Sequence, residues 1–373
     1  MADFDLKALY GALGNLLSSI DPGIQAVRKL DIEMTDLKLS TNATTKELKD
    51  FYYSSTDIAK QLGKSTQEVM SQTNEWVRLG YSIKEASTLA KNTMILESIS
   101  PGMDMGTAAD SLTNTLKSFR LDADEALDGI INKINVIGNS GSLSNTDIAD
   151  ILNSSSEAMS RANNTLEETI ALSTAASQAT TDTGLIGNTL NAMAENIQEK
   201  SMLISDLTRN TSTLDGINLF TDADNDTFRS TYQILSDISS VWNNMDTGNR
   251  EQLISSLADG ESSEIISSII TNFDTARNSM DLMAGSAGSA MQSMGEVYDS
   301  LDYKLNRLSE TGTGIAKNLF GGSEMKTVVD GINSVGNAVE WITDKIGLLG
   351  TSGAISGLLM NRAGIGERTT FQW

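Results

Sequence analysis

The chain has 373 residues and a formal net charge of −22 at pH 7, and it contains neither cysteine nor histidine. These absences exclude disulfides, thiolate catalysis, histidine-dependent zinc sites and Ser-His-Asp triads, so an enzyme of this sequence would have to rely on carboxylates. The acidic balance also argues against specific nucleic-acid binding, because a phosphate-neutralising surface needs clustered Lys and Arg.

Helical patterning dominates the chain from end to end. Hydrophobic residues make up 39% of the sequence, aromatic residues only 5%, and there are two prolines. Few prolines allow long uninterrupted helices, since proline removes a helical hydrogen bond. We therefore predict an all-α fold, a multi-helix bundle of amphipathic helices with short turns. One small β-hairpin is expected near 216–229, where two short apolar pieces flank an acidic run.

The first half of the chain alternates apolar helical patterns with Gly, Asn, Ser and Pro punctuation. The spacing predicts helices over 1–21, 24–39, 45–62, 69–79, 82–98, 105–119, 123–137, 148–162 and from 166 onward. Capping boxes are expected at Ser65 with Glu68, and Ser144 with Asp147 is expected to cap the helix that follows.

The second half continues the pattern with different boundaries. Residues 180–187 read as a polar turn with two glycines, and 208–229 contain the hairpin signal. The spacing predicts helices over 190–207, 231–242, 250–257 and 264–273, and a longer one from about 274 to 308.

Two segments about 83 residues apart share a pattern of helix, tight turn and capped helix. The first turn is followed by Ser82 with Glu85, and the second by Thr165 with Glu168. In each capping box the hydroxyl caps one backbone N–H and the glutamate accepts from another. An internal duplication explains the recurrence, and so does chance in a helical protein rich in capping boxes; the sequence leaves both open.

Composition divides the chain into four predicted regions. These are N-terminal helices at 1–45, a repeated helical core at 46–207, a second helical region with the hairpin at 208–310, and a Gly-rich apolar tail at 311–373. The tail holds an uncharged segment, 346–360, shorter than the roughly 20 residues that a spanning helix needs. A packed apolar tail and a membrane-active segment are both compatible with it. The N-terminus carries no secretory signal pattern.

One acidic loop has part of a calcium-binding pattern. Asp222, Asp224 and Asp226 occupy the first, third and fifth positions of an EF-hand loop. The sixth position is Thr227, where such a loop needs glycine, and the twelfth is Gln233, where it needs a bidentate glutamate. A solvated loop is the better interpretation.

The other candidate residues have structural interpretations. Glu167 and Glu168 suit the N-terminus of a helix, where negative charge is favourable. Apolar stripes and tryptophans in helical patterns are expected to pack in a core or against a partner; they include Met280, Met283, Met291, Met294, Trp76, Trp242 and Trp341. We therefore predict no catalytic residue, no cofactor-binding residue and no metal ligand.

The order of several weak motifs resembles the core domain of phage tail tape measure proteins. The resemblance covers roughly residues 50–308, and the segments that carry it are 76–90, 122–139, 147–176, 184–190, 215–220, 228–235, 241–242, 286–291 and 298–305. One departure is visible at 259–262, where the family usually has a basic turn and this chain has Asp-Gly-Glu-Ser. Any role of that basic turn is therefore not carried over.

The resemblance implies a structural, non-enzymatic protein of a long-tailed phage or tail-like particle. Such proteins lie extended in the tail lumen, set tail length during tube assembly, and leave the tail before the DNA. The implied partners are the tail tube protein, tail assembly chaperones and tail tip or baseplate proteins, with host membrane contact at ejection and homo-oligomerisation left open. The implied location is the virion tail lumen, and the host cytoplasm during assembly.

Two other hypotheses come from the sequence itself. A membrane-active injected protein would act through the apolar segment 346–360. A carboxylate-based peptidoglycan hydrolase is motivated only by the acidic content of the chain.

Overall fold

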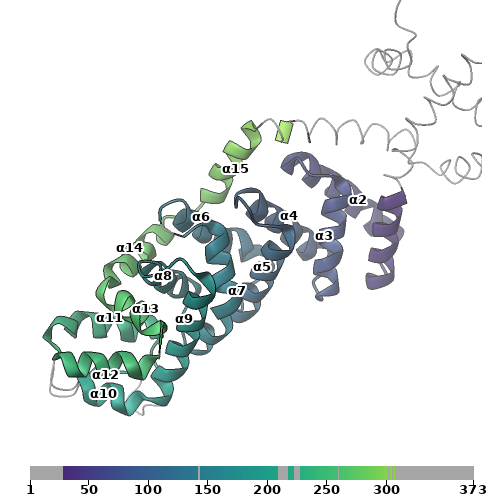
Figure 1. Cartoon of the computed structure of the whole chain (residues 1–373). Helices are drawn as coiled ribbons and strands as arrows, with labels where there is room; N and C mark the ends of the chain where they lie inside the picture. The colour runs from purple at the N-terminus through teal and green to yellow at the C-terminus, as the bar shows by residue number, and fades with distance from the viewer. Residues whose placement is uncertain are drawn as a thin grey trace, which may run out of the picture. The chain divides into compact units, whose positions relative to one another are not determined.

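The computed structural model describes residues 28–300 except 142, 209–216, 222–226 and 259, together with 303, 304 and 306. The predicted all-α fold is confirmed, because in this part of the chain helices follow one another through short turns (Figure 1). The expected hairpin is reduced to a single antiparallel bridge between Phe220 and Phe228, the only β pairing among the described residues.

A helix at residues 28–41 begins the described chain. The helices that follow are α2 (Thr45–Leu62), α3 (Thr66–Arg78), α4 (Ile83–Ser98), α5 (Met105–Phe119), the 3-10 turn η1 (Ala123–Glu125), the π-helix η2 (Ala126–Ile131), α6 (Asn132–Gly138), α7 (Asn145–Arg161), α8 (Leu166–Ala176), α9 (Thr183–Glu199), α10 (Ser201–Thr208), α11 (Thr231–Val241), the 3-10 turn η3 (Trp242–Asn244), α12 (Thr247–Leu257), α13 (Ser262–Thr271), α14 (Phe273–Ala284) and α15 (Ser289–Asp299).

The chain forms two compact units, one of which contains residues 1–74 and 305–373. Its described part, 28–74, holds the first helix, α2 and most of α3. Leu37 and Phe51 are buried there, and the Asn74 side chain donates to both the carbonyl and the carboxylate of Glu33.

The second unit spans Glu75–Lys304 and contains α4 to α15. Helix α7 is central to it, because α5, α8 and α9 all pack against this helix, and α14 packs against α8 (Figure 1). Apolar side chains at helical spacing on α7, such as Ile148, Ile151 and Leu152, are fully buried. Burial of these stripes is the main favourable contribution to the fold.

The predicted helix caps are confirmed at the level of hydrogen bonds. Capping boxes close the N-termini of α4, α7 and α8 as expected, and Ser65 and Glu68 exchange the same pair of bonds at α3. The predicted helix over 45–62 is confirmed as α2, and its N-cap is Thr44, which forms a capping box with Glu47. The spacing of three residues that a capping box requires selects Thr44.

The polar turn predicted over 180–187 is wrong in its second half. Helix α9 begins at Thr183, so Gly184 and Gly187 are helical. A Cβ atom at Gly187 would overlap the Ser154 hydroxyl of α7, and its absence lets the two helices approach closely. Glycine serves close packing here, which a sequence pattern cannot separate from a turn.

The single helix predicted over 123–137 is divided into a 3-10 turn, a π-helix and α6. The consecutive residues Ile130 and Ile131 of the π-helix are both fully buried. The predicted helix over 190–207 is likewise divided at Lys200, between α9 and α10.

The long helix expected from 274 to 308 is also interrupted within the described residues. Helix α14 ends at Ala284, and α15 begins at Ser289, with Gly288 in the left-handed region at φ 80°. Phe273 opens α14 and does not end the preceding helix, because α13 stops at Thr271.

Most of the residues expected to pack do so. Trp76, Trp242, Met283 and Met294 are buried, whereas Met291 is exposed. Trp341, the helix 1–21, the acidic run 222–226 and the apolar segment 346–360 lie outside the described residues. Among the helices that the structure does describe, none combines the length and the apolar character needed to cross a membrane.

Candidate functional site

The two predicted repeats have the same backbone geometry at their turns. In the first, Gly80 has φ 100° and the Tyr81 N–H donates to the Trp76 carbonyl; in the second, Asn163 has φ 61° and the Asn164 N–H donates to the Met159 carbonyl. Each turn leads into a capping box. The same kind of turn and helix start also occurs at Gly63, before Ser65 and Glu68, and at Arg120, before Asp122 and Glu125. This geometry is therefore a recurrent connection of the fold, and it does not decide between duplication and chance.

The first turn is stabilised by aromatic packing. Trp76 is 1% exposed, its indole N–H donates to the Thr93 hydroxyl at 3.2 Å, and its ring lies edge-on to Tyr81 at 5.5 Å. Desolvation by burial raises the pKa of Tyr81, and the nearby Glu85 carboxylate adds to this effect. Glu85 itself is exposed.

The second turn contacts a distant part of the chain. The Asn163 amide donates to the Phe228 carbonyl at 2.9 Å, and the Asn164 side-chain oxygen accepts the Tyr232 N–H at 3.0 Å. The Ser230 hydroxyl donates to the Glu168 carboxylate at 3.0 Å and accepts the Gln233 N–H at 3.1 Å. Glu168 and Ser230 thus join the N-termini of α8 and α11, and we call this set of contacts the α8–α11 junction.

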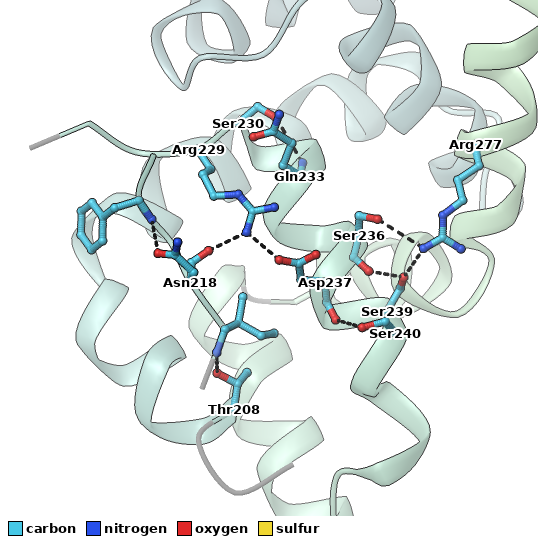
Figure 2. A network of polar contacts seen from close by, with 12 residues as sticks. Thr208, Asn218, Arg229, Ser230, Gln233, Ser236, Asp237, Ser239, Ser240 and Arg277 are labelled. Atoms are coloured by element: carbon cyan, nitrogen blue, oxygen red, sulfur yellow. Dashed lines mark hydrogen bonds and ion pairs between the residues drawn. The ribbon is translucent and has the colours of Figure 1, made fainter. Parts of the chain in front are cut away.

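A wider polar network continues from the junction along α11 (Figure 2). Arg229 donates to the Asn218 carbonyl at 2.7 Å and to the Asp237 carboxylate at 2.6 Å. On the other side of α11, Arg277 of α14 donates to Ser236 and Ser239 (Figure 2). These bonds fix α11 between the bridge segment and α14.

The electrostatics of the junction centre on two adjacent glutamates. Desolvation by burial raises the pKa of Glu168, although the Thr165 N–H and the Ser230 hydroxyl act in the opposite direction. Desolvation also acts on Glu167, but hydrogen bonding and the charge of Lys133 outweigh it and lower the pKa of that carboxyl. The Glu167–Lys133 ion pair has an N–O distance of 2.6 Å.

The opposite environments of Glu85 and Glu168 predict opposite pH dependence. The pKa of Glu168 is raised in the fold, so its contribution to stability is full below its unfolded pKa and is lost as the pH rises through its folded pKa. The pKa of Glu85 is lowered by its hydrogen bonds to Ser82, so its contribution is present above its unfolded pKa and is lost as the pH falls through its folded value.

This difference is measured by urea unfolding between pH 3 and 7 of the wild type, Glu168→Gln and Glu85→Gln. Glutamine keeps the capping hydrogen bond but not the charge. As the pH rises through the carboxyl range, the wild type should lose stability relative to Glu168→Gln and gain stability relative to Glu85→Gln. If the free energies of unfolding of the two variants changed with pH in parallel, Glu85 and Glu168 would not have the opposite pKa shifts described above.

The interactions observed at the junction are hydrogen bonds and an ion pair. Each carboxylate is engaged by N–H, hydroxyl or ammonium donors. No cluster of three or more carboxylates suited to a metal ion occurs in the described ranges. The loop with Asp222, Asp224 and Asp226 is outside those ranges, so its interpretation as a solvated loop stays a prediction.

Sequence reasoning identified Glu168 as a helix-cap residue but missed its partner. Ser230 and Gln233 have the three-residue spacing of a capping box, and this signal predicts the start of α11. The contact between Glu168 and Ser230 joins residues 62 positions apart, and no local pattern predicts such a pairing.

Comparison with known proteins gives one family. The model of a family described as phage-related minor tail protein matches residues 56–259, more than half of the chain. That range contains both repeats and the α8–α11 junction. No solved structure matches the chain.

Proposed function

The chain belongs to the phage-related minor tail protein family, which indicates a structural role in the phage tail, and we propose that it is a tail tape measure protein. In this proposal it lies in the tail lumen and sets the length of the tube. The observation that carries the proposal is helical continuity. Between 28 and 300 most described segments are helices, and every connection except 209–230 has at most six residues.

Helical continuity matters because a ruler needs a length proportional to residue number. An α-helix rises about 1.5 Å per residue, so 373 helical residues would span roughly 560 Å. Apart from the connection over 209–230, the helices are joined by at most six residues, and straightening those joints would give an extended form. The resemblance of the sequence to tape measure proteins supports the same role.

The charge of the chain suits the proposed location. A net charge of −22 would keep the chain soluble before assembly and would repel the phosphates of DNA that follows it through the tube. We propose the tail tube protein, tail assembly chaperones and tail tip or baseplate proteins as its partners. The chaperones would hold the apolar helix faces that straightening exposes.

The proposed location and release can be tested on purified virions. The chain should be present in intact tails, protected from added protease, and should be lost from tails after ejection is triggered in vitro. Quantitative mass spectrometry of the two samples measures this. A chain that is digested on intact tails would lie on the outside, and one that stays in emptied tails would not be a released ruler; either result contradicts the proposal.

A further inference from the structure

The sequence of α14 and α15 carries one apolar stripe that runs through the break between them. Its members alternate at intervals of three and four residues, the heptad spacing of a continuous helix: Phe273, Ala276, Met280, Met283, Ala287, Ala290, Met294 and Val297. The four residues between the helices keep this register. The apolar register therefore fits one continuous helix, whereas the structure has two and the glycines at 285 and 288 weaken a helix at this point.

The break itself is a short segment in which Ser286 is buried and the other three residues are exposed. Gly285 ends α14, and Gly288 is held at φ 80°, a conformation that disfavours other L-residues. A Cβ at Gly288 would meet nothing within 4 Å, so only backbone conformation selects glycine there. Ala287, a stripe member, is exposed as a consequence of the break.

Helix α15 lacks its own cap and obtains one from α6. Its N-cap is Gly288, which has no side chain, and the Asn132 side-chain oxygen accepts the Ala290 N–H at 2.9 Å instead. The Asn132 carbonyl accepts the Ser289 hydroxyl at 2.8 Å. A helix N-terminus needs such partners for its free N–H groups, so this bond stabilises the broken form.

The remaining contacts of α15 combine hydrogen bonds with a small apolar contact. The Asn135 amide donates to Ser293 at 3.1 Å and the Asn139 amide donates to the same hydroxyl at 3.2 Å. Only Ala290 and Met294 of α15 are buried, although the helix lies against α6 and α4 (Figure 1). Hydrogen bonds of this kind exchange readily with water and contribute little net stability.

We propose that residues 285–288 are a helix switch. In the state described here they break the helix, and α15 is docked on α6 through Asn132. In the other state they are helical, one helix runs from Phe273 to Asp299 with its apolar stripe in register, and α15 leaves α6. The inference concerns conformation alone and does not rest on length determination. A conflict between a local preference and a tertiary contact is the physical basis of two states.

The docked state can be trapped in this cysteine-free chain. Asn139→Cys with Ser293→Cys places two thiols on positions whose native side chains are joined by a hydrogen bond, so a short bifunctional thiol reagent should cross-link them in the full-length protein. Adding Gly288→Ala should slow this reaction, because alanine resists the left-handed conformation. Gly288→Asn should slow it much less, since asparagine tolerates that conformation.

The second state is detected by spin labels on exposed positions of α14 and α15, Asn278→Cys and Glu296→Cys. In one continuous helix these residues are roughly 27 Å apart along the axis. The left-handed conformation costs alanine about 1–2 kcal/mol. Gly288→Ala should therefore raise the ratio of molecules with one continuous helix to molecules with docked α15 by roughly five- to thirty-fold. Asn132→Ala should act in the same direction by removing the cap.

Gly295→Ala is the matched control, because it adds a methyl group to the middle of α15 in open space without touching the break. It should leave the distances between the spin labels at positions 278 and 296 unchanged. Two results would overturn the proposal: distances in Gly288→Ala that equal those of the wild type, or loss of cross-linking without the population near 27 Å, which would mean that α15 unfolds when it is released.

Discussion

Replacing Trp76 with alanine is expected to lower the free energy of unfolding by about 3–5 kcal/mol. The Trp76 side chain is 1% exposed, packs against Tyr81, and donates to Thr93. Its removal leaves a large cavity at the first turn, where α3 ends and α4 begins. Urea unfolding followed by circular dichroism measures the change.

Two further variants separate the sources of this effect. Trp76→Phe keeps most of the apolar volume and loses only the indole N–H, so it should cost clearly less than Trp76→Ala. Leu79→Ala removes an exposed side chain one turn away and should stay within about 0.5 kcal/mol of the wild type. Equal destabilisation by Trp76→Ala and Leu79→Ala would mean that Trp76 is not a packing anchor.

Gly138→Ala is expected to destabilise the protein by about 1–3 kcal/mol, although alanine is normally the better helix former. A Cβ at Gly138 would lie 2.8 Å from the Asn145 backbone nitrogen and would overlap its side-chain oxygen. That side chain donates to the Ile99 carbonyl at 3.0 Å, so displacing it also removes a bond between α7 and the end of α4.

Rescue experiments distinguish a backbone clash from a side-chain clash. Asn145→Ala should not rescue Gly138→Ala, because the backbone nitrogen remains in the way. Ser154→Ala should largely rescue Gly187→Ala, since the closest atom there is the Ser154 hydroxyl. Denaturant midpoints of the single and double variants test both expectations, and full rescue of Gly138→Ala by Asn145→Ala would show that the helices can separate freely at that point.

Local chemistry explains why much of the fold follows from the sequence. A capping box is a contact between residues three apart, so Ser82 with Glu85 and Thr165 with Glu168 were predictable with their partners. Helices with clear apolar periods, such as α5 at Met105–Phe119, were predictable to the residue.

The features that could not be predicted depend on contacts between distant segments. The close approach to Ser154 explains why residue 187 is glycine within a helix, and Asn132 sustains the helix break at Gly288. Glu168 is bound at the α8–α11 junction by Ser230, whereas Glu85, the capping-box glutamate of the first repeat, is exposed. In each of these cases a tertiary contact decides between local alternatives of similar energy.

Tail length after a repeat-sized deletion tests the ruler function most directly. Deleting 83–165 from the native gene joins Ser82 to Leu166, so Ser82 again has a glutamate, Glu168, at the third helical position. Tails measured by electron microscopy should be shorter by roughly 125 Å, and tails from a duplication of the same segment should be longer by the same amount. Tails of unchanged length in both variants would contradict the account.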